Sequence, residues 1–284
     1  MKRILVGVDG TDHSLAGLGW ATRLAERTGA KVIVANVVHS DQAELSVEAA
    51  DALAVETERH LLTDWSAPLH ATDVPWSTLV LTGDPDALLG AADREDVDLI
   101  VVGIRRHGSV AALHIGSLAH HLAHLTRRPL AIIPEPAAEH PIDHIVVGVD
   151  GTDGANAAAR FAADLASHTG ADTLAAYVFE PLAEWVPEND PRSWRQAAQH
   201  KLDTDWIHPL LSAGVSVKTS IIEDLHPVAA LTAAAAGAGA GLIVVGTSRV
   251  SDAFGMRLGR LPLQLVHHAQ TPVVLVPPGP ASSG

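Results

Sequence analysis

The chain repeats itself, and this repeat constrains the fold more than any other feature of the sequence. Residues 4–10 read ILVGVDG and residues 145–151 read IVVGVDG, so that Asp9 and Asp150 stand 141 positions apart. The similarity continues at the same offset through the helix-forming stretch that follows each segment. We therefore predict that the 284 residues form two copies of one unit.

The boundary between the copies lies in a proline-rich stretch. By Gly103 and Gly246, each at the end of an LIVVG run, the offset has grown to 143, which fits a two-residue insertion in the second copy. Residues 134–141 read PEPAAEHP and have the polar, proline-rich composition of a linker. The expected domains are residues 1–137 and residues 141–284.

Each copy alternates short apolar runs with helical patterns. Between the runs, apolar residues recur at the helical spacing, and Gly29 is placed to end the first helix as a left-handed C-cap. Strands that are apolar on both faces and separated by helices indicate parallel strands covered on both sides. The expected fold class is α/β, with two tandem doubly wound, Rossmann-like sheets of five mostly parallel strands and helices on both faces. In the first copy the strands are expected at residues 3–8, 31–38, 76–82, 97–103 and 129–133.

Composition and charge exclude several classes of protein. Apolar residues make up 47% of the chain and charged residues 18%, which is enough apolar material for a core and excludes disorder. The net charge of −14 repels a phosphate backbone, so nucleic acid is not an expected partner. The chain has no cysteine, which excludes disulfides and cysteine-based metal sites. No apolar run is long enough to span a bilayer and no signal peptide is recognisable, so we expect a cytoplasmic protein without a membrane partner.

The motifs of both copies resemble the universal stress protein family in its tandem two-domain form. The resemblance rests on the GVDGT opening, the LIVVG run, the glycine-spaced loop after it and the closing helix that leads into a last apolar run. Nucleotide-binding members carry Gly, two residues, Gly, nine residues, Gly and then Ser or Thr in that loop. The first copy offers Gly103, Arg106, Gly116 and Ser117 at these four positions, and the second offers Gly246, Arg249, Gly259 and Arg260.

The resemblance implies an adenine nucleotide, typically ATP with or without Mg²⁺, as the ligand. Glycines in such a loop let backbone amides approach phosphate oxygens at a helix N-terminus, and Ser117 can add a hydroxyl donor. In the first copy the candidate binding residues are Asp9, Gly10, Thr11, Val38, Gly83, Gly103, Arg105, Arg106, Gly116 and Ser117. In the second copy they are Asp150, Gly246, Arg249 and Gly259.

An arginine replaces the second glycine of the pattern in both copies, and two interpretations stay open. The side chains of Arg106 and Arg249 either fill the phosphate volume or grip the phosphates in place of backbone amides. Asp224 stands in the second copy where the first has Gly83, and it adds bulk and negative charge. We therefore expect nucleotide in the first domain and a degenerate site in the second.

Two further sets of residues suggest other roles. His120 and His124 form an i, i+4 pair, but closing a zinc site needs a third ligand, so no metal site is assigned. Trp65 and Trp206 recur between the copies and are expected to serve packing or contacts between domains.

The resemblance implies a regulatory module of the stress response and not an enzyme. No nucleophile and base pair is identifiable, and no residue is assigned as catalytic. The alternatives are a protein-interaction scaffold without nucleotide and a slow, Mg²⁺-dependent ATP hydrolase that uses Asp9. The last strand of each copy is expected at a sheet edge, which predicts pairing of the two domains within the chain and also allows a homodimer.

Overall fold

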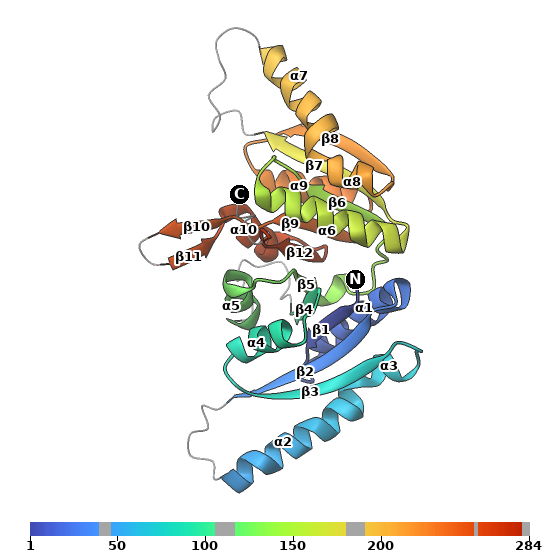
Figure 1. Ribbon diagram of the computed structural model, residues 1–284, viewed down its shortest axis with the longest axis vertical. Helices are drawn as coiled ribbons and strands as arrows, with labels where there is room; N and C mark the ends of the chain where they lie inside the picture. The colour runs from blue at the N-terminus through green and yellow to red at the C-terminus, as the bar shows by residue number, and fades with distance from the viewer. Residues whose placement is uncertain (40–46, 106–116, 180–190, 253–254, 280–284) are drawn as a thin grey trace. The chain divides into compact units, whose positions relative to one another are not determined.

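The chain divides into two compact units, Met1–Glu139 and His140–Gly284. Figure 1 shows the strands and helices of each unit. The computed structural model describes residues 1–39, 47–105, 117–179, 191–252 and 255–279.

The first unit is built on a parallel sheet with the strand order β3-β2-β1-β4-β5. Ile4, Leu5 and Val6 of β1 are completely buried, because layers of helices cover both faces of the strand. The expected strands are all present, with ends that shift by at most two residues. Their bounds are β1 Arg3–Gly7, β2 Lys31–His39, β3 Trp76–Gly83, β4 Leu99–Ile104 and β5 Leu130–Pro134.

The helices of this unit lie on the two faces of the sheet. Helix α1 packs on β1, β4 and β5 and also contacts α3, whereas α4 and α5 contact one another. This division confirms the doubly wound α/β arrangement. The helices are α1 Asp12–Thr28, α2 Val47–Leu62, α3 Ala67–His70, α4 Asp86–Arg94 and α5 Ser117–Leu125, with short 3₁₀ turns at Asp64–Ser66 and Glu135–Ala137.

The first helix of each unit has the same caps. The hydroxyl of Thr11 accepts a hydrogen bond from the amide of Ser14, and Thr152 does the same at the start of the second unit's first helix. Gly29 ends α1 in the left-handed conformation at φ 72°, as expected from the sequence.

The second unit repeats the fold with the strand order β8-β7-β6-β9-β12. Its strands are β6 His144–Gly148, β7 Asp172–Phe179, β8 Val217–Glu223, β9 Leu242–Gly246 and β12 Val273–Val276. Its helices are α6 Asp153–Thr169, α7 Pro191–Lys201, α8 His208–Ser212, α9 Pro227–Gly237 and α10 Arg260–His268, with a π-helical turn at Leu202–Trp206.

An antiparallel hairpin in the second unit was not expected from the sequence. Strands β10 Arg249–Asp252 and β11 Gly255–Leu258 pair after β9, where the sequence predicts a glycine-spaced loop. Asp252 and Gly255 flank the reversal, and both residue types favour turns.

The start of the expected linker is packed against the first unit. Ala137 and Ala138 are buried, and the guanidinium of Arg23 on α1 donates a hydrogen bond to the Ala138 carbonyl. Arg23 also forms an ion pair with Glu139 at 3.3 Å. Composition alone indicates a linker here. In the structure, the two buried alanines and the contacts of Arg23 attach residues 137–139 to the first unit.

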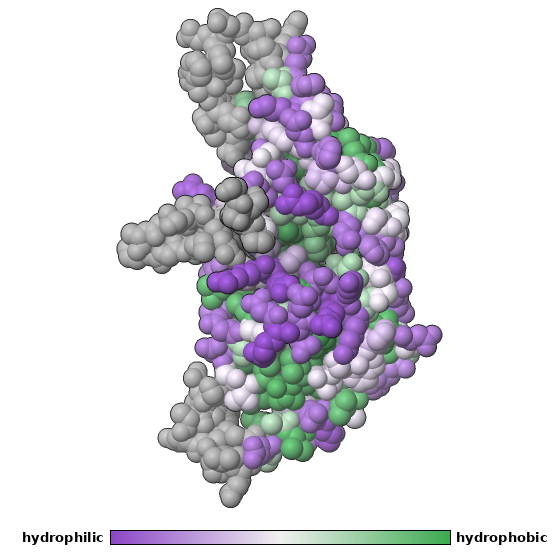
Figure 2. All heavy atoms as spheres, in the orientation of Figure 1, coloured by the Kyte–Doolittle hydropathy of each residue, from purple (hydrophilic) through white to green (hydrophobic). Residues whose placement is uncertain are grey.

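Polar side chains cover much of the face drawn in Figure 2. In Figure 2, purple and white residues make up most of the coloured face and green residues gather in smaller areas, as expected when strands and the inner faces of helices carry many of the apolar residues into the core. Across the described ranges, no helix combines the length and apolar character needed to span a bilayer.

Candidate functional site

A cavity of about 380 Å³ opens in the first unit where its strand order reverses. The chain runs outward from β1 to β3 and then returns to β4 on the other side of β1. Sheets of this type bind ligands at such a reversal, outside the carboxyl ends of the strands. The volume lies within the range of about 300 to 1,000 Å³ that is typical of small-molecule sites.

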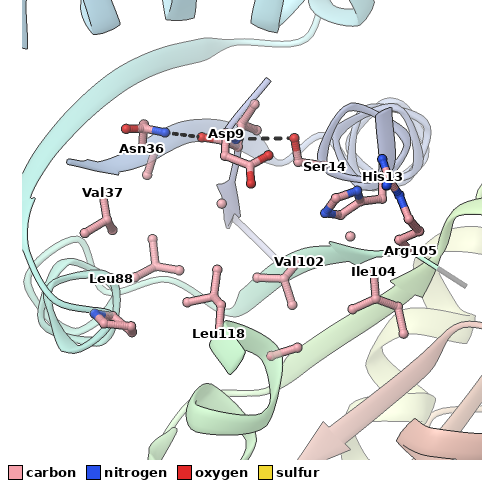
Figure 3. A pocket seen from close by; sticks show the side chains of 16 residues that line it. Asp9, His13, Ser14, Asn36, Val37, Leu88, Val102, Ile104, Arg105 and Leu118 are labelled. Carbon is pink, nitrogen blue, oxygen red and sulfur yellow. Dashed lines mark hydrogen bonds between the residues drawn. The ribbon is translucent and has the colours of Figure 1, made fainter. Parts of the chain in front are cut away.

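Most of the cavity wall is apolar. These side chains come from strands β2 and β4 and helices α4 and α5, and they include Val37, Leu88, Val102, Ile104 and Leu118. Figure 3 draws Val37 and Leu88 at one side of the cavity and His13 and Arg105 at the other. The polar lining residues are Asp9, His13, Ser14, Asn36 and Arg105.

Asp9 follows β1, and Thr11 holds its carboxylate. Oδ1 of Asp9 accepts hydrogen bonds from the Thr11 hydroxyl at 2.5 Å and from the Thr11 amide at 3.1 Å. Burial by itself raises the pKa of Asp9, but these bonds, the Ser14 hydroxyl and the nearby His13 imidazole outweigh burial and hold that pKa below its usual value. Asp9 is therefore a carboxylate at neutral pH.

The first turn of α1 places two more polar side chains at the cavity. The Ser14 hydroxyl donates a hydrogen bond to the Thr11 carbonyl at 2.9 Å and accepts one from the Asp9 amide at 3.3 Å. Nε2 of His13 lies 3.1 Å from the Thr11 hydroxyl oxygen, whereas Nδ1 of His13 is buried without a hydrogen-bond partner. On the neighbouring strand, Asn36 donates to the carbonyl of Val8 at 2.7 Å.

The predicted binding residues of the first unit fall into three groups. Asp9, Gly103 and Arg105 line the cavity. Arg106 and Gly116 lie outside the described residues, and Ser117 is the first residue of α5. Gly10, Thr11, Val38 and Gly83 are not among the described lining residues.

The glycines of the two LIVVG runs serve close contact between a helix and a strand. A Cβ atom built on Gly103 would overlap the carbonyl oxygen of His13, and one built on Gly17 of α1 would lie 2.9 Å from the Gly103 amide nitrogen. In the second unit, a Cβ on Gly246 would likewise overlap the backbone of Gly154. This geometry gives both glycines a packing role that is independent of phosphate.

Gly10 also has a packing role, and Trp65 explains it. Gly10 has φ 80°, and a Cβ there would lie 2.5 Å from the indole nitrogen of Trp65. Gly151, with φ 81°, meets the indole of Trp206 in the same way. The recurring tryptophans therefore cover the turn that carries each aspartate, which agrees with their expected packing role.

The histidines of α5 are engaged in local contacts. Nε2 of His121 lies 2.7 Å from Oδ1 of Asp86, and the rings of His120 and His124 lie 4.6 Å apart. In the part of the chain that the structure covers, no group of three or more histidine or acidic side chains is arranged to hold a metal ion.

The second unit keeps the aspartate turn but changes its surroundings. Oδ1 of Asp150 accepts hydrogen bonds from the Thr152 amide at 2.9 Å and from the Thr152 hydroxyl at 2.6 Å. Tyr177 is buried and packs edge-on against the indole of Trp206. The repeat pairs His13, Ser14, Asn36 and Arg105 with Gly154, Ala155, Tyr177 and Ser248. The second unit thus lacks an imidazole, an amide and a guanidinium at these positions.

The remaining predicted residues of the second unit lie around the loop after β9. Gly246 ends β9, Arg249 begins β10, and Gly259 precedes α10. A Cβ on Gly259 would lie 2.8 Å from the hydroxyl oxygen of Ser248. The hairpin therefore includes Arg249 in a strand, where the sequence predicts a loop.

Three cavity-lining polar residues were not predicted from the sequence. His13 and Ser14 stand in the first turn of the helix after β1, and Asn36 stands near the end of β2. Their position beside the reversal of strand order is a signal that was available, because side chains at these two strand ends face the ligand site of such a sheet.

Comparison with known proteins identifies the family. The Universal stress protein family profile matches residues 1–134 and again 141–277. The chain is 27% identical to a universal stress protein of Mycobacterium tuberculosis, over 98% of this chain and 96% of that protein. A universal stress protein of Mycolicibacterium smegmatis is 26% identical and aligns over 97% of each chain. A universal stress protein structure from Archaeoglobus fulgidus shares the fold with a TM-score of 0.76 at 18% identity, over 98% of each chain. With two matches to one family profile, the chain belongs to the universal stress protein family in its tandem form.

Proposed function

We propose that the first unit binds an adenine nucleotide and that the protein is a regulatory module of the stress response. In this proposal the two domains are residues 1–137 and 141–284, and the first carries the functional site. The family resemblance implies ATP, with or without Mg²⁺, as the ligand.

The observation that carries the proposal is the cavity at the strand reversal. Its apolar wall, from Val37 and Leu88 to Ile104, suits a flat purine ring. Asp9 and Asn36 add hydrogen-bonding groups, and the exposed guanidinium of Arg105 supplies a cation for phosphate oxygens in a protein of net charge −14.

In the proposal the second unit binds nucleotide poorly or not at all. The bulky Tyr177 occupies the position of Asn36, and Ser248 occupies the position of the cationic Arg105. Asp224, at the position of Gly83, adds a negative charge that repels phosphates.

We favour a binding protein over a slow ATP hydrolase because of the state of Asp9. Its lowered pKa makes the carboxylate a weak general base. Incubation with ATP and Mg²⁺ tests this point. Turnover that disappears in Asp9→Ala would favour the hydrolase.

The decisive experiment combines calorimetry with a matched pair of variants. Leu118 and Leu261 hold the second position of α5 and of α10 and are counterparts by the repeat. Leu118→Trp places a larger side chain in the cavity wall and is expected to abolish binding of ATP and AMP. Leu261→Trp makes the same change in the second unit and is expected to leave binding intact.

Two results would refute the proposal. Wild-type protein that shows no heat of binding with ATP or AMP, and releases no adenine nucleotide on denaturation, would leave the interaction scaffold as the better account. Binding that Leu261→Trp abolishes and Leu118→Trp preserves would place the site in the second unit.

A further inference from the structure

Nδ1 of His13 is an unsatisfied nitrogen in the lining of the cavity. The atom is buried and has no hydrogen-bond partner, although the imidazole belongs to a residue that lines the cavity. Figure 3 shows the His13 ring extending from the start of α1 toward the cavity. Buried polar atoms are nearly always hydrogen-bonded, so an exception at a cavity calls for an explanation.

The other two unsatisfied side-chain nitrogens of the described residues have different surroundings. Nε1 of Trp20 is buried within the core of the unit, and Trp20 is 1% exposed. Nδ1 of His60 lies 3.6 Å from a carboxylate oxygen of Asp64. Neither residue lines the cavity. His13 is therefore the member of this group that belongs to the lining of the cavity.

A chain of hydrogen bonds sets the proton position on His13. The Thr11 hydroxyl has one proton, which it donates to the carboxylate of Asp9 at 2.5 Å. At neutral pH the Asp9 carboxylate has no proton to donate, so the direction of this bond is fixed. The Thr11 oxygen must then accept from Nε2 of His13, which lies 3.1 Å away. Neutral His13 consequently carries its proton on Nε2 and has a free lone pair on Nδ1.

We propose that His13 is a ligand-recognition residue, whose Nδ1 accepts a hydrogen bond from a hydroxyl or amino group of the molecule bound in the cavity. This inference rests on the proposed function and adds a requirement to it. To neutral His13 the ligand must present a hydrogen-bond donor, because a carbonyl or phosphate oxygen would place two lone pairs against each other. A nucleotide offers such donors on both its sugar and its base.

The second unit provides a natural contrast. It keeps the bond from the Thr152 hydroxyl to Asp150, but Gly154 takes the position of His13 and offers no acceptor. The aspartate and threonine thus form the turn in both units, and the imidazole is the addition specific to the first.

Two substitutions of His13 separate its two nitrogens. In His13→Gln the amide nitrogen can replace Nε2 beside Thr11, but no acceptor remains at the position of Nδ1. In His13→Asn the amide oxygen can replace Nδ1, while the contact with Thr11 is lost. His168→Gln on α6 is the matched control, because this histidine bonds within its own helix and is not a lining residue.

Calorimetric titration with AMP is expected to give about tenfold weaker binding for His13→Gln, the effect of losing one buried hydrogen bond. His13→Asn should retain most of the affinity, and His168→Gln all of it. AMP analogues without the 2′-hydroxyl, without the 3′-hydroxyl or with a dimethylated amino group identify the donor. The analogue that lacks the donor bound by His13 should bind the wild type more weakly than AMP does. In His13→Gln the same analogue should cause no further loss of affinity.

Several results would overturn the inference. If the wild type binds AMP and His13→Gln binds equally well, His13 plays no part in recognition, and the proposed function stands. Nitrogen-15 NMR of the ligand-free protein tests the proton position independently. A proton on Nδ1 refutes the inference whether or not nucleotide binds. If the wild type binds no nucleotide, the proposed function fails, and a proton on Nε2 still supports the acceptor at the cavity.

Discussion

Replacing Gly10 by alanine tests how the turn that carries Asp9 is held. Gly10 combines a left-handed backbone, with φ 80°, and direct contact with Trp65. A Cβ atom there would lie 2.5 Å from Cε2 and Nε1 and 2.7 Å from Cζ2 of the indole. The substitution therefore introduces backbone strain and a steric clash at once.

The two contributions have different sizes and can be separated. A non-glycine residue in the left-handed region costs about 1 to 2 kcal/mol. Forcing a methyl group into a packed site costs about 1 to 3 kcal/mol more. The free energy of unfolding should therefore fall by about 2 to 5 kcal/mol in Gly10→Ala. In a Trp65→Ala background the clash is absent, and only the backbone cost of about 1 to 2 kcal/mol should remain.

Urea denaturation followed by circular dichroism measures this cycle of four proteins. Gly29 provides the control, because it has φ 72° and a Cβ there would meet nothing within 4 Å. Gly29→Ala should cost only the backbone contribution, with or without Trp65. The reasoning is wrong if Gly10→Ala costs no more than Gly29→Ala, or if removing Trp65 leaves the cost of Gly10→Ala unchanged.

Three further predictions follow from the site and from the end of the first unit. Because the pKa of Asp9 is lowered in the folded protein, its stabilising effect is present above the unfolded value of about 4 and is lost as the pH falls through the folded pKa. The difference in free energy of unfolding between wild type and Asp9→Asn should shrink below pH ~4, and a difference that grows there in denaturation curves would contradict this. Arg105→Ala should weaken the binding of ATP about tenfold in calorimetric titrations at low salt but leave the affinity for adenosine unchanged. Equal losses of affinity for the two ligands would show that the guanidinium does not contact phosphate. Arg23→Ala removes the bond to the Ala138 carbonyl, so it should lower the stability by about 1 kcal/mol and speed proteolysis beside Glu139, and unchanged digestion would count against that attachment.

The fold was largely predictable because it depends on features that are local or repeated in the sequence. The apolar runs that become β1 and β4 are buried on both faces, and such strands are recognisable without knowledge of their partners. Gly29 ends its helix as predicted, because a left-handed C-cap involves only neighbouring residues. Strand ends differ by one or two residues, since the last hydrogen bonds of a strand depend on the adjacent strand.

The candidate site was less predictable because its geometry comes from contacts across the sheet. Asp9 and Arg105, which the motifs single out, line the cavity, but the sequence does not show that Thr11 faces the Asp9 carboxylate or that His13 has one unsatisfied nitrogen. Gly103 illustrates the opposite difficulty. Its motif predicts phosphate contact, while the overlap of a Cβ with the His13 carbonyl shows a packing requirement that no motif states.

The hairpin of the second unit has a consequence for anion binding that goes beyond its shape. A phosphate held by a loop needs several backbone N–H groups that are free to point at it. Antiparallel pairing of Arg249–Asp252 with Gly255–Leu258 directs backbone N–H groups of both strands at carbonyls of the opposite strand. The backbone after β9 has thus already used donors that an anion would require, so restoring a glycine at Arg249 alone would not create a phosphate site.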